Sequence, residues 1–215
     1  MEQRLFLSIY GGDNNTPVDI ITHSGIMVTM EDYAMSVAER LPEKPYGLIE
    51  PRFERIGSTE YAMSSPGYKH QNVLLAVGSQ LREKLQASGC MTIVAPFDVY
   101  PLYDKGDEYT LVQPDIFTAC DRSKLQDNRY NGAPKFIVEI LSSNRSHDMV
   151  TKLNLYERAG VTEYWIIDPE EQFINTLELV DGKYFTSAYT GEDEVPLASI
   201  PGCTVDFKKV FESQT

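Results

Sequence analysis

Two short apolar runs constrain the fold of this chain more than any other feature of its sequence: KFIVEIL at 135–141 and EYWIID at 163–168. Nearly continuous apolar runs of this length are typical of strands that are buried on both faces. Residues 142–160, between the two runs, predict a loop and then a helix, with Ser146 as its N-cap and Gly160 as its C-terminal stop. A strand, a helix and a second strand in this order indicate a sheet that is covered by helices.

The remaining segments predict an α/β (α+β) fold with a central mixed β-sheet flanked by helices. Apolar residues spaced by three and four predict an amphipathic helix over 69–87. Another helix is predicted over 30–41, because Thr29 is a suitable N-cap. Strand patterns occupy segments that are separated by turns: an antiparallel pair at 48–62, single strands at 90–102 and 109–120, and a hairpin at 173–189.

The length of 215 residues suits one domain. Residues 1–26 show no clear periodicity, so we expect an irregular N-terminal extension there and a single domain over 27–215. No apolar run approaches the roughly 20 residues that a membrane-spanning helix needs, and the first residues form a poor signal peptide. We therefore expect a cytoplasmic protein without a membrane partner.

The formal net charge of −13 argues against tight, non-specific binding of nucleic acid, which usually requires a basic surface. This net charge still permits a local basic patch on the surface. Basic residues are dense in one part of the sequence: Arg122, Lys124, Arg129, Lys135 and Arg145.

Glu139 is the most informative polar residue, because it interrupts the apolar run at 135–141. A charge inside a buried strand costs several kcal/mol unless it is paired or bound to a metal. Asp115 also stands at the start of an apolar strand pattern, directly after Pro114. Two acids on neighbouring strands can converge on one hard cation, which prefers oxygen ligands. The alternatives are a solvent-facing or ion-paired Glu139 and a turn-forming Asp115.

Lys152 adds a cation to these two acids. On the helix after Ser146, residues 148, 152 and 156 share one face, which aligns Asp148, Lys152 and Tyr156. The alternative is a solvated polar stripe with a weak Asp148–Lys152 ion pair.

The other potential metal ligands, histidines and cysteines, are better explained by structural roles. His70 and His147 have no partner at metal-ligand spacing, and we interpret them as surface or capping residues. The three cysteines, Cys90, Cys120 and Cys203, are far apart and odd in number, so they predict separate thiols rather than a disulfide framework or a zinc site.

The combination of Pro114-Asp115, Glu139-Ile140-Leu141 and Lys152 resembles the PD-(D/E)XK nuclease superfamily, and more closely its Uma-two family of restriction-endonuclease-like proteins. The resemblance covers roughly residues 27–190. It rests on these stretches of the sequence: MTMEDY, FERIG, YAMSSPGYKH, APFDVY, VQPDIF and GAPKFIVEILSSNRSHDMVTKLNLYERAGVTEYWIIDP.

The resemblance implies a restriction-endonuclease-like core in which Asp115 and Glu139 bind Mg²⁺ or Mn²⁺, with the main-chain carbonyl of Ile140 as a further ligand. It implies that Glu54 lies near the same site. The superfamily lysine is expected two residues after the second acid, where this chain has Leu141. The resemblance implies that a lysine on the next helix replaces it.

Lys152 matches that helical position, and Tyr156 matches a recurrent tyrosine that supports the site. One departure affects the acidic residues: where relatives often have ERIDGE, this chain has ERIGST at 54–59, without the second Glu.

The resemblance predicts a metal-dependent endonuclease that hydrolyses phosphodiester bonds of DNA, with weak or structure-selective binding, and it allows a homodimer. The alternatives are a nuclease-fold protein with little or no activity that acts as a binding or regulatory module, and a hydrolase of another phosphate ester. The set of Asp115, Glu139 and Lys152 favours retained chemistry, because a degenerate copy would be free to lose one of the three.

Overall fold

The computed structural model describes residues 9–10, 19–21, 27–29, 52–142 and 148–212, and the chain divides into units of residues 1–50 and 51–215. In the first unit, a small antiparallel sheet has the order β1-β2-β3, with strands at Ile9–Tyr10, Asp19–Ile21 and Met27–Thr29. The helix predicted over 30–41 lies outside the described residues. The domain boundary expected after residue 26 stays a prediction.

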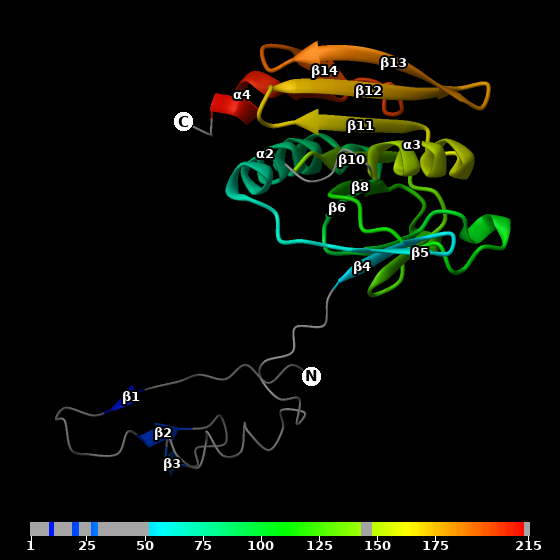
Figure 1. Ribbon diagram of the computed structural model, residues 1–215. Coiled ribbons are helices and arrows are strands. Elements are labelled where there is room, and N and C mark those ends of the chain that lie inside the picture. Colours follow the sequence, from blue (N-terminus) through cyan, green and yellow to red (C-terminus); the bar gives the residue numbers. More distant parts are fainter. Residues whose placement is uncertain (1–8, 11–18, 22–26, 30–51, 143–147, 213–215) are drawn as a thin grey trace. The chain divides into compact units, whose positions relative to one another are not determined.

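A six-stranded mixed sheet forms the centre of the second unit (Figure 1). Its order is β13-β12-β11-β10-β8-β6; β10 and β11 are parallel, and the other neighbours are antiparallel. The strands are β6 (Met91–Val94), β8 (Ile116–Ala119), β10 (Phe136–Ile140), β11 (Glu163–Asp168), β12 (Phe173–Val180) and β13 (Lys183–Thr190). The predicted central mixed sheet is confirmed, and both apolar runs lie at its centre.

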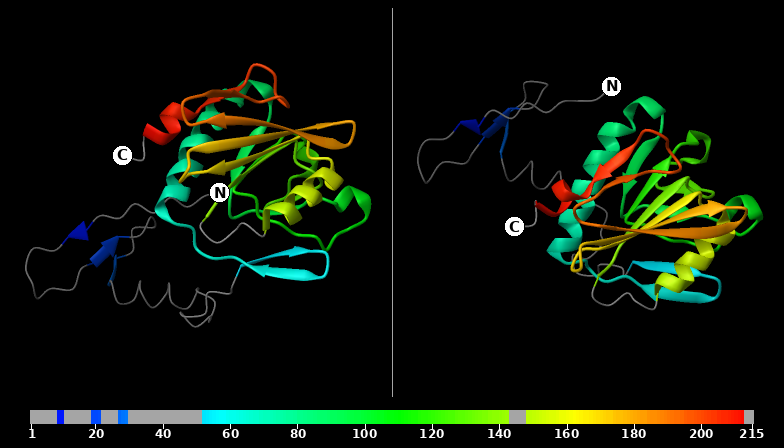
Figure 2. Two further views of the ribbon diagram at one scale, coloured as in Figure 1. Left: turned by 45° about the horizontal axis from the view of Figure 1, so that its top comes forward. Right: turned by 90° about the horizontal axis from the view of Figure 1, so that it is seen from above.

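Two helices cover opposite faces of this sheet, α2 (Tyr68–Lys84) and α3 (Asp148–Ala159) (Figure 2). Alternate residues of a strand point to opposite faces, so each face has its own apolar cluster. The α2 side includes Val73, Val77, Leu81, Ile116, Val138, Ile140 and Trp165. The α3 side includes Leu155, Tyr156, Phe117, Ile137, Tyr164 and Ile166. Glu139, which lies between Val138 and Ile140, therefore belongs to the α3 side.

Smaller elements complete the second unit. The predicted antiparallel pair is present as β4 (Phe53–Ile56) and β5 (Thr59–Ala62), joined by a turn in which Gly57 has a φ of 61°. Further pairs are formed by β7 (Asp98–Tyr100) with β9 (Arg129–Asn131), and by β14 (Glu194–Pro196) with β15 (Thr204–Asp206). Short 3-10 helices are η1 (Gln86–Ser88), η2 (Tyr103–Lys105) and η3 (Arg122–Lys124).

The last helix, α4 (Phe207–Glu212), was not predicted from the sequence. It packs on the α2 side through Phe207, Val210 and Phe211. Within the part of the chain that the structure describes, every helix is too short or too polar to cross a bilayer.

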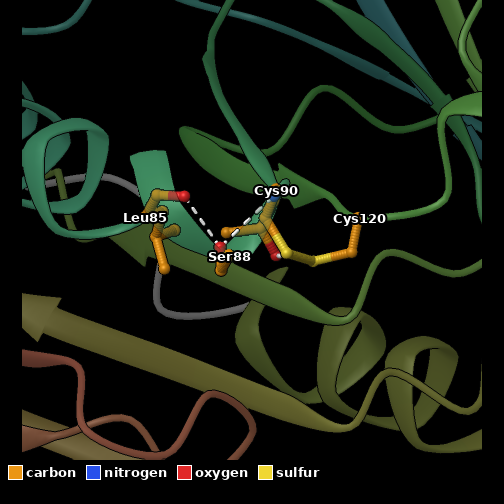
Figure 3. Close-up of a disulfide and its surroundings, with 5 residues drawn as sticks. Leu85, Ser88, Cys90 and Cys120 are labelled. Atoms are coloured by element: carbon orange, nitrogen blue, oxygen red, sulfur yellow. Dashed lines mark hydrogen bonds between the residues drawn. A yellow bond between two sulfur atoms is a disulfide. The ribbon is translucent and has the colours of Figure 1, made fainter.

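Cys90 and Cys120 are joined by a disulfide (Figure 3). The prediction of separate thiols is therefore wrong for this pair, whereas Cys203 is free and buried. The pairing follows from the sheet: Met91 lies opposite Ala119 in the antiparallel β6–β8 pair, so the residues immediately outside these two also face each other. Because the pairing depends on which strands are neighbours, the spacing of cysteines in the sequence could not reveal it.

We expect one reactive thiol in the denatured protein without reductant, Cys203, and three after reduction. The disulfide closes a loop with a sequence separation of 30 residues. Its reduction should lower the free energy of unfolding by about 3–4 kcal/mol, because the unfolded chain gains conformational entropy. Alkylation followed by mass spectrometry, and chemical denaturation with and without reductant, measure both quantities; Cys203→Ser is the control. Alkylation of three thiols without reductant would contradict the disulfide.

Candidate active site

The register of β8 and β10 brings the two acids together. Phe117 pairs with Ile137, and Ile116 pairs with Val138. One step further along this antiparallel register, Asp115 lies opposite Glu139. Directly opposite residues project from the same face of a sheet with their Cβ atoms about 5 Å apart. Both side chains are buried, with each residue 5% exposed. The antiparallel pair therefore provides two neighbouring carboxylates at one end of the central strands.

The Asp115 carboxylate is held in place by hydrogen bonds to one of its two oxygens. Its Oδ2 accepts hydrogen bonds from the Ile140 main-chain N–H at 2.8 Å and from His70 Nε2 at 3.1 Å. His70 donates this bond in the tautomer that carries a proton on Nε2, because the role of each ring nitrogen depends on the tautomer. Among the described residues, no donor reaches the other oxygen, Oδ1. The two bonds to Oδ2 hold the carboxylate in one orientation and leave Oδ1 available.

Lys152 lies between two acids. Its Nζ is 2.9 Å from Glu139 Oε1 and 2.9 Å from Glu54 Oε1, and the residue is 3% exposed. One turn later on α3, the Tyr156 hydroxyl donates to Glu139 Oε1 at 2.8 Å. Lys152 therefore does not belong to a solvated stripe. The Asp148 side chain lies outside the described part of the chain.

Glu54 reaches the site from β4. Backbone hydrogen bonds between Arg55 and Leu111, at 2.7 and 2.8 Å, hold this strand beside the segment that leads into β8. The Gln113 N–H then donates to Glu54 Oε1 at 2.8 Å. Glu54 is 3% exposed, so its charge is balanced locally by Lys152 and by this N–H rather than by water.

The surroundings shift the protonation of Glu139. Burial is the largest cause, and it raises the pKa of the Glu139 carboxyl from 4.5 to about 7; the negative charges of Asp115 and Glu54 add to the rise, and Lys152 opposes it. Burial and the nearby Glu139 also raise the pKa of Tyr156 well above its usual value. Tyr156 is therefore neutral at any ordinary pH and serves as a hydrogen-bond donor.

The donor set fits a hard divalent cation only in part. Among the described residues, no three His, Cys, Asp or Glu side chains form a ready-made metal cluster. However, Asp115 Oδ1 and Glu139 Oε2 accept no hydrogen bond from that part of the chain. The N–H and C=O of a residue in an extended strand point to the same side, so the Ile140 carbonyl faces β8 as its N–H does. Two carboxylate oxygens and a carbonyl, completed by water, suit Mg²⁺ or Mn²⁺.

His70 is the site residue that the sequence interpretation missed. It lies in the first turn of α2, is 4% exposed and contacts Asp115, so it is neither a surface nor a capping histidine. A signal was present in the sequence. His70 precedes Val73 and Val77 on the buried stripe of the helix, and a polar residue on such a stripe requires a partner. His147 lies outside the described residues.

The dense basic segment of the sequence does not form one free patch. Lys124 is paired with Asp104 at 2.6 Å, and the Arg129 guanidinium lies over the Tyr100 ring at 5.6 Å from its centroid. Arg145 lies outside the part of the chain that is described. The basic residues of this segment therefore give only a weak electrostatic reason for binding nucleic acid.

Comparison with known proteins agrees with the predicted family. The family model Uma2, described as "Putative restriction endonuclease", matches residues 41–208. The fold is similar to the crystal structure of "a putative nuclease belonging to DUF820 from Anabaena variabilis ATCC 29413", with a TM-score of 0.63 and 20% sequence identity; the match covers 83% of this chain and 97% of that chain. No curated protein matches the chain. The predicted fold class is confirmed, whereas the roles of individual residues stay predictions.

The raised pKa of Glu139 predicts a pH dependence of stability. Between its ordinary value of 4.5 and about 7, the folded protein retains a proton that the unfolded chain has lost. The contribution of Glu139 to the free energy of unfolding must then decrease as pH rises through this window. We expect Glu139→Gln to remove this decrease in urea denaturation with EDTA, and Glu178→Gln, an exposed change on β12, to retain it. Parallel pH profiles for wild type and Glu139→Gln would contradict the assignment.

Proposed function

Because this chain belongs to the Uma2 family, we propose that it is a Mg²⁺- or Mn²⁺-dependent endonuclease that hydrolyses phosphodiester bonds of DNA. The observation that carries the proposal is the convergence of Asp115, Glu139 and Lys152 in one buried place, although they come from three separate elements. A purely structural ion pair would need only Lys152 and one acid. The additional acid, with an oxygen that accepts no hydrogen bond from the described residues, is better explained by a ligand.

In this proposal, Asp115, Glu139 and the Ile140 carbonyl hold the cation. The bound metal would lower the pKa of a water molecule and polarise a phosphoryl oxygen. The protein fixes the ligands beforehand: His70 and the Ile140 N–H orient Asp115, while Tyr156 and Lys152 hold the Oε1 atom of Glu139. Both acids would then offer their remaining oxygens to a cation from orientations that the protein already fixes, which would keep the entropy cost of binding low.

Lys152 supplies the positive charge that the superfamily places on the strand. An ammonium group in a buried site stabilises the charge that develops on the phosphate oxygens, because no water competes with it there. Glu54 is a positioning residue in this scheme. It holds the ammonium from the side opposite Glu139, both at 2.9 Å from Nζ. This arrangement also keeps the buried charges paired before substrate arrives.

We also propose His70 as a positioning residue. A histidine that donates to a metal-binding carboxylate fixes its orientation and its basicity. His70 meets this requirement through its 3.1 Å contact with Asp115 Oδ2. Its position in the first turn of α2 connects the packing of that helix to the direction of the Asp115 carboxylate.

DNA binding in this proposal is weak or selective for structure, because a protein of net charge −13 lacks a broad basic surface. A homodimer would present two such centres to the two strands of a duplex. Light scattering of the purified protein, with and without duplex, measures this association directly.

Glu139→Gln should reduce metal-dependent cleavage by at least about a hundredfold, because one metal ligand loses its charge while its shape is retained. We expect Asp115→Asn to behave similarly. Gel assays with single-stranded, duplex and branched DNA, in Mg²⁺ and in Mn²⁺, measure the effect. Glu178→Gln, which makes the same chemical change on the exposed side of β12, should leave cleavage unchanged.

Cleavage by both site variants at the wild-type rate would refute the endonuclease proposal. No cleavage by the wild type on any substrate, together with metal binding in calorimetry that the Asp115→Asn variant loses, would favour the binding-module alternative instead.

Replacing His70 should weaken the metal site without unfolding the protein. We expect His70→Ala to reduce Mn²⁺ affinity by about 10–100-fold in calorimetry, and His70→Gln to recover part of it, because the amide can still donate to Asp115. Melting temperatures of both variants separate this effect from a loss of packing. Equal Mn²⁺ affinity in His70→Ala and wild type would exclude the positioning role.

A further inference from the structure

A pocket of about 230 Å³ opens next to Asp115, at the N-terminal end of α2. Its polar lining combines the side chains that already orient Asp115 with side chains that have no assigned role. Asp115 and His70 form the inner wall, and Arg52, Ser64 and Gln71 lie further out. Apolar side chains complete the lining. Asp115 thus belongs both to this pocket and to the candidate metal site, whereas the other proposed ligands, Glu139 and Ile140, are not among the lining residues.

The outer polar side chains of this pocket are all able to donate hydrogen bonds. Arg52, Ser64 and Gln71 are exposed, and among the described residues none of their side chains forms a hydrogen bond or an ion pair. A guanidinium, a hydroxyl and an amide together offer the donors that a tetrahedral anion accepts. Among the described residues, Asp115 is the only acidic side chain in the lining. The pocket therefore has a cationic outer part and a single anionic position at its inner end.

The helix that borders the pocket favours the same kind of ligand. α2 is 17 residues long; its N-cap, Gly67, makes no side-chain cap, and no acidic residue lies in the first turn. The first turn of α2 therefore has no acidic residue of its own to compensate the partial positive charge of this helix end, although Lys69 and His70 in this turn contact Glu170 and Asp115. In addition, the buried His70 lines the pocket, and its Nδ1 has no hydrogen-bond partner in the described part of the chain.

We infer that this pocket is a subsite for one phosphate group of a nucleic acid strand, adjacent to the phosphate that is cleaved. The inference rests on the proposed function, because the cation at Asp115 would separate the two phosphates from the carboxylate. Arg52 binds the phosphate through its planar guanidinium, and Gln71 and Ser64 complete the donors. The phosphate belongs either to a chain terminus or to an internal phosphodiester of the same strand.

A subsite that binds one phosphate is compatible with the acidic net charge of the protein. Affinity that depends on many phosphate contacts falls steeply with salt, whereas one contact produces a shallow dependence. With a net charge of −13, the protein can gain affinity from one well-defined phosphate without a basic surface. Recognition of a single phosphate also makes the structure of the strand more important than its length.

The test measures binding separately from cleavage. The probes are short, internally labelled single-stranded oligonucleotides with a 5′-phosphate, a 3′-phosphate or only hydroxyl ends, and binding to the full chain is followed by fluorescence anisotropy in Ca²⁺ without Mg²⁺. Gln71→Glu places a repelling charge in the pocket. Gln86→Glu is the matched control, because it makes the same change on the exposed part of η1, beyond the opposite end of α2.

We expect Gln71→Glu to weaken binding about tenfold or more, and Gln86→Glu less than about twofold. Arg52→Gln should reduce the slope of log affinity against log salt by about 0.7, because one phosphate contact is lost. Sensitivity confined to one phosphorylated end identifies a terminal phosphate, and equal sensitivity of all three probes identifies an internal one. Either pattern supports the subsite.

Equal weakening by Gln71→Glu and Gln86→Glu, an unchanged salt slope in Arg52→Gln, or no binding of any probe by the wild type would overturn the inference. Cleavage assays of the same variants keep the two proposals apart. Pocket-dependent binding without cleavage by the wild type would reject the endonuclease and leave the phosphate subsite in place.

Discussion

The buried ammonium of Lys152 imposes the constraint on which the rest of this site depends. A charged group with 3% exposure is tolerated only if opposite charges meet it at hydrogen-bond distance, and here Glu139 and Glu54 do so, both at 2.9 Å from Nζ. These three residues come from α3, β10 and β4, so the pairing holds together three elements that are far apart in sequence. Removal of the ammonium would leave the buried carboxylates of Glu139 and Glu54 without this opposite charge.

Without a further cation, the described residues of the site carry more negative than positive charge. Among the described residues, Lys152 pairs with Glu139 and Glu54, and Asp115 contacts His70. The pKa of Glu139 rises to about 7, with burial as the main cause and the two other acids as additional ones. An arrangement selected for stability alone would have fewer acids or more cations. The excess of negative charge, in a place where two carboxylate oxygens accept no hydrogen bond from the described residues, is the physical basis for proposing a divalent metal there.

The sequence was sufficient for those features that depend on local periodicity. The apolar runs around Glu139 and Trp165 predicted the two central strands, and the spacing of Lys152 and Tyr156 predicted their shared helical face, as the structure has them. Features that depend on which strands are neighbours could not be predicted in this way. The Cys90–Cys120 disulfide requires the β6–β8 register, and the contact of His70 with Asp115 requires the packing of α2 on the sheet. The position of Glu54 was taken from a family resemblance, because nothing local in FERIG indicates that its carboxylate is buried.

The antiparallel register of β8 and β10 also affects the stability of incorrectly paired sheets. If the two strands slipped by one residue, Glu139 would be opposite an apolar neighbour of Asp115, and one of the two acids would turn into the α2 side of the core. Such a sheet would be penalised by a buried, unpaired charge, and it would also lack the convergent oxygens. Mispaired sheets would therefore be less stable, and they would lack the proposed metal site. The residues that are proposed to act on a substrate therefore also disfavour an incorrect register of the sheet that carries them.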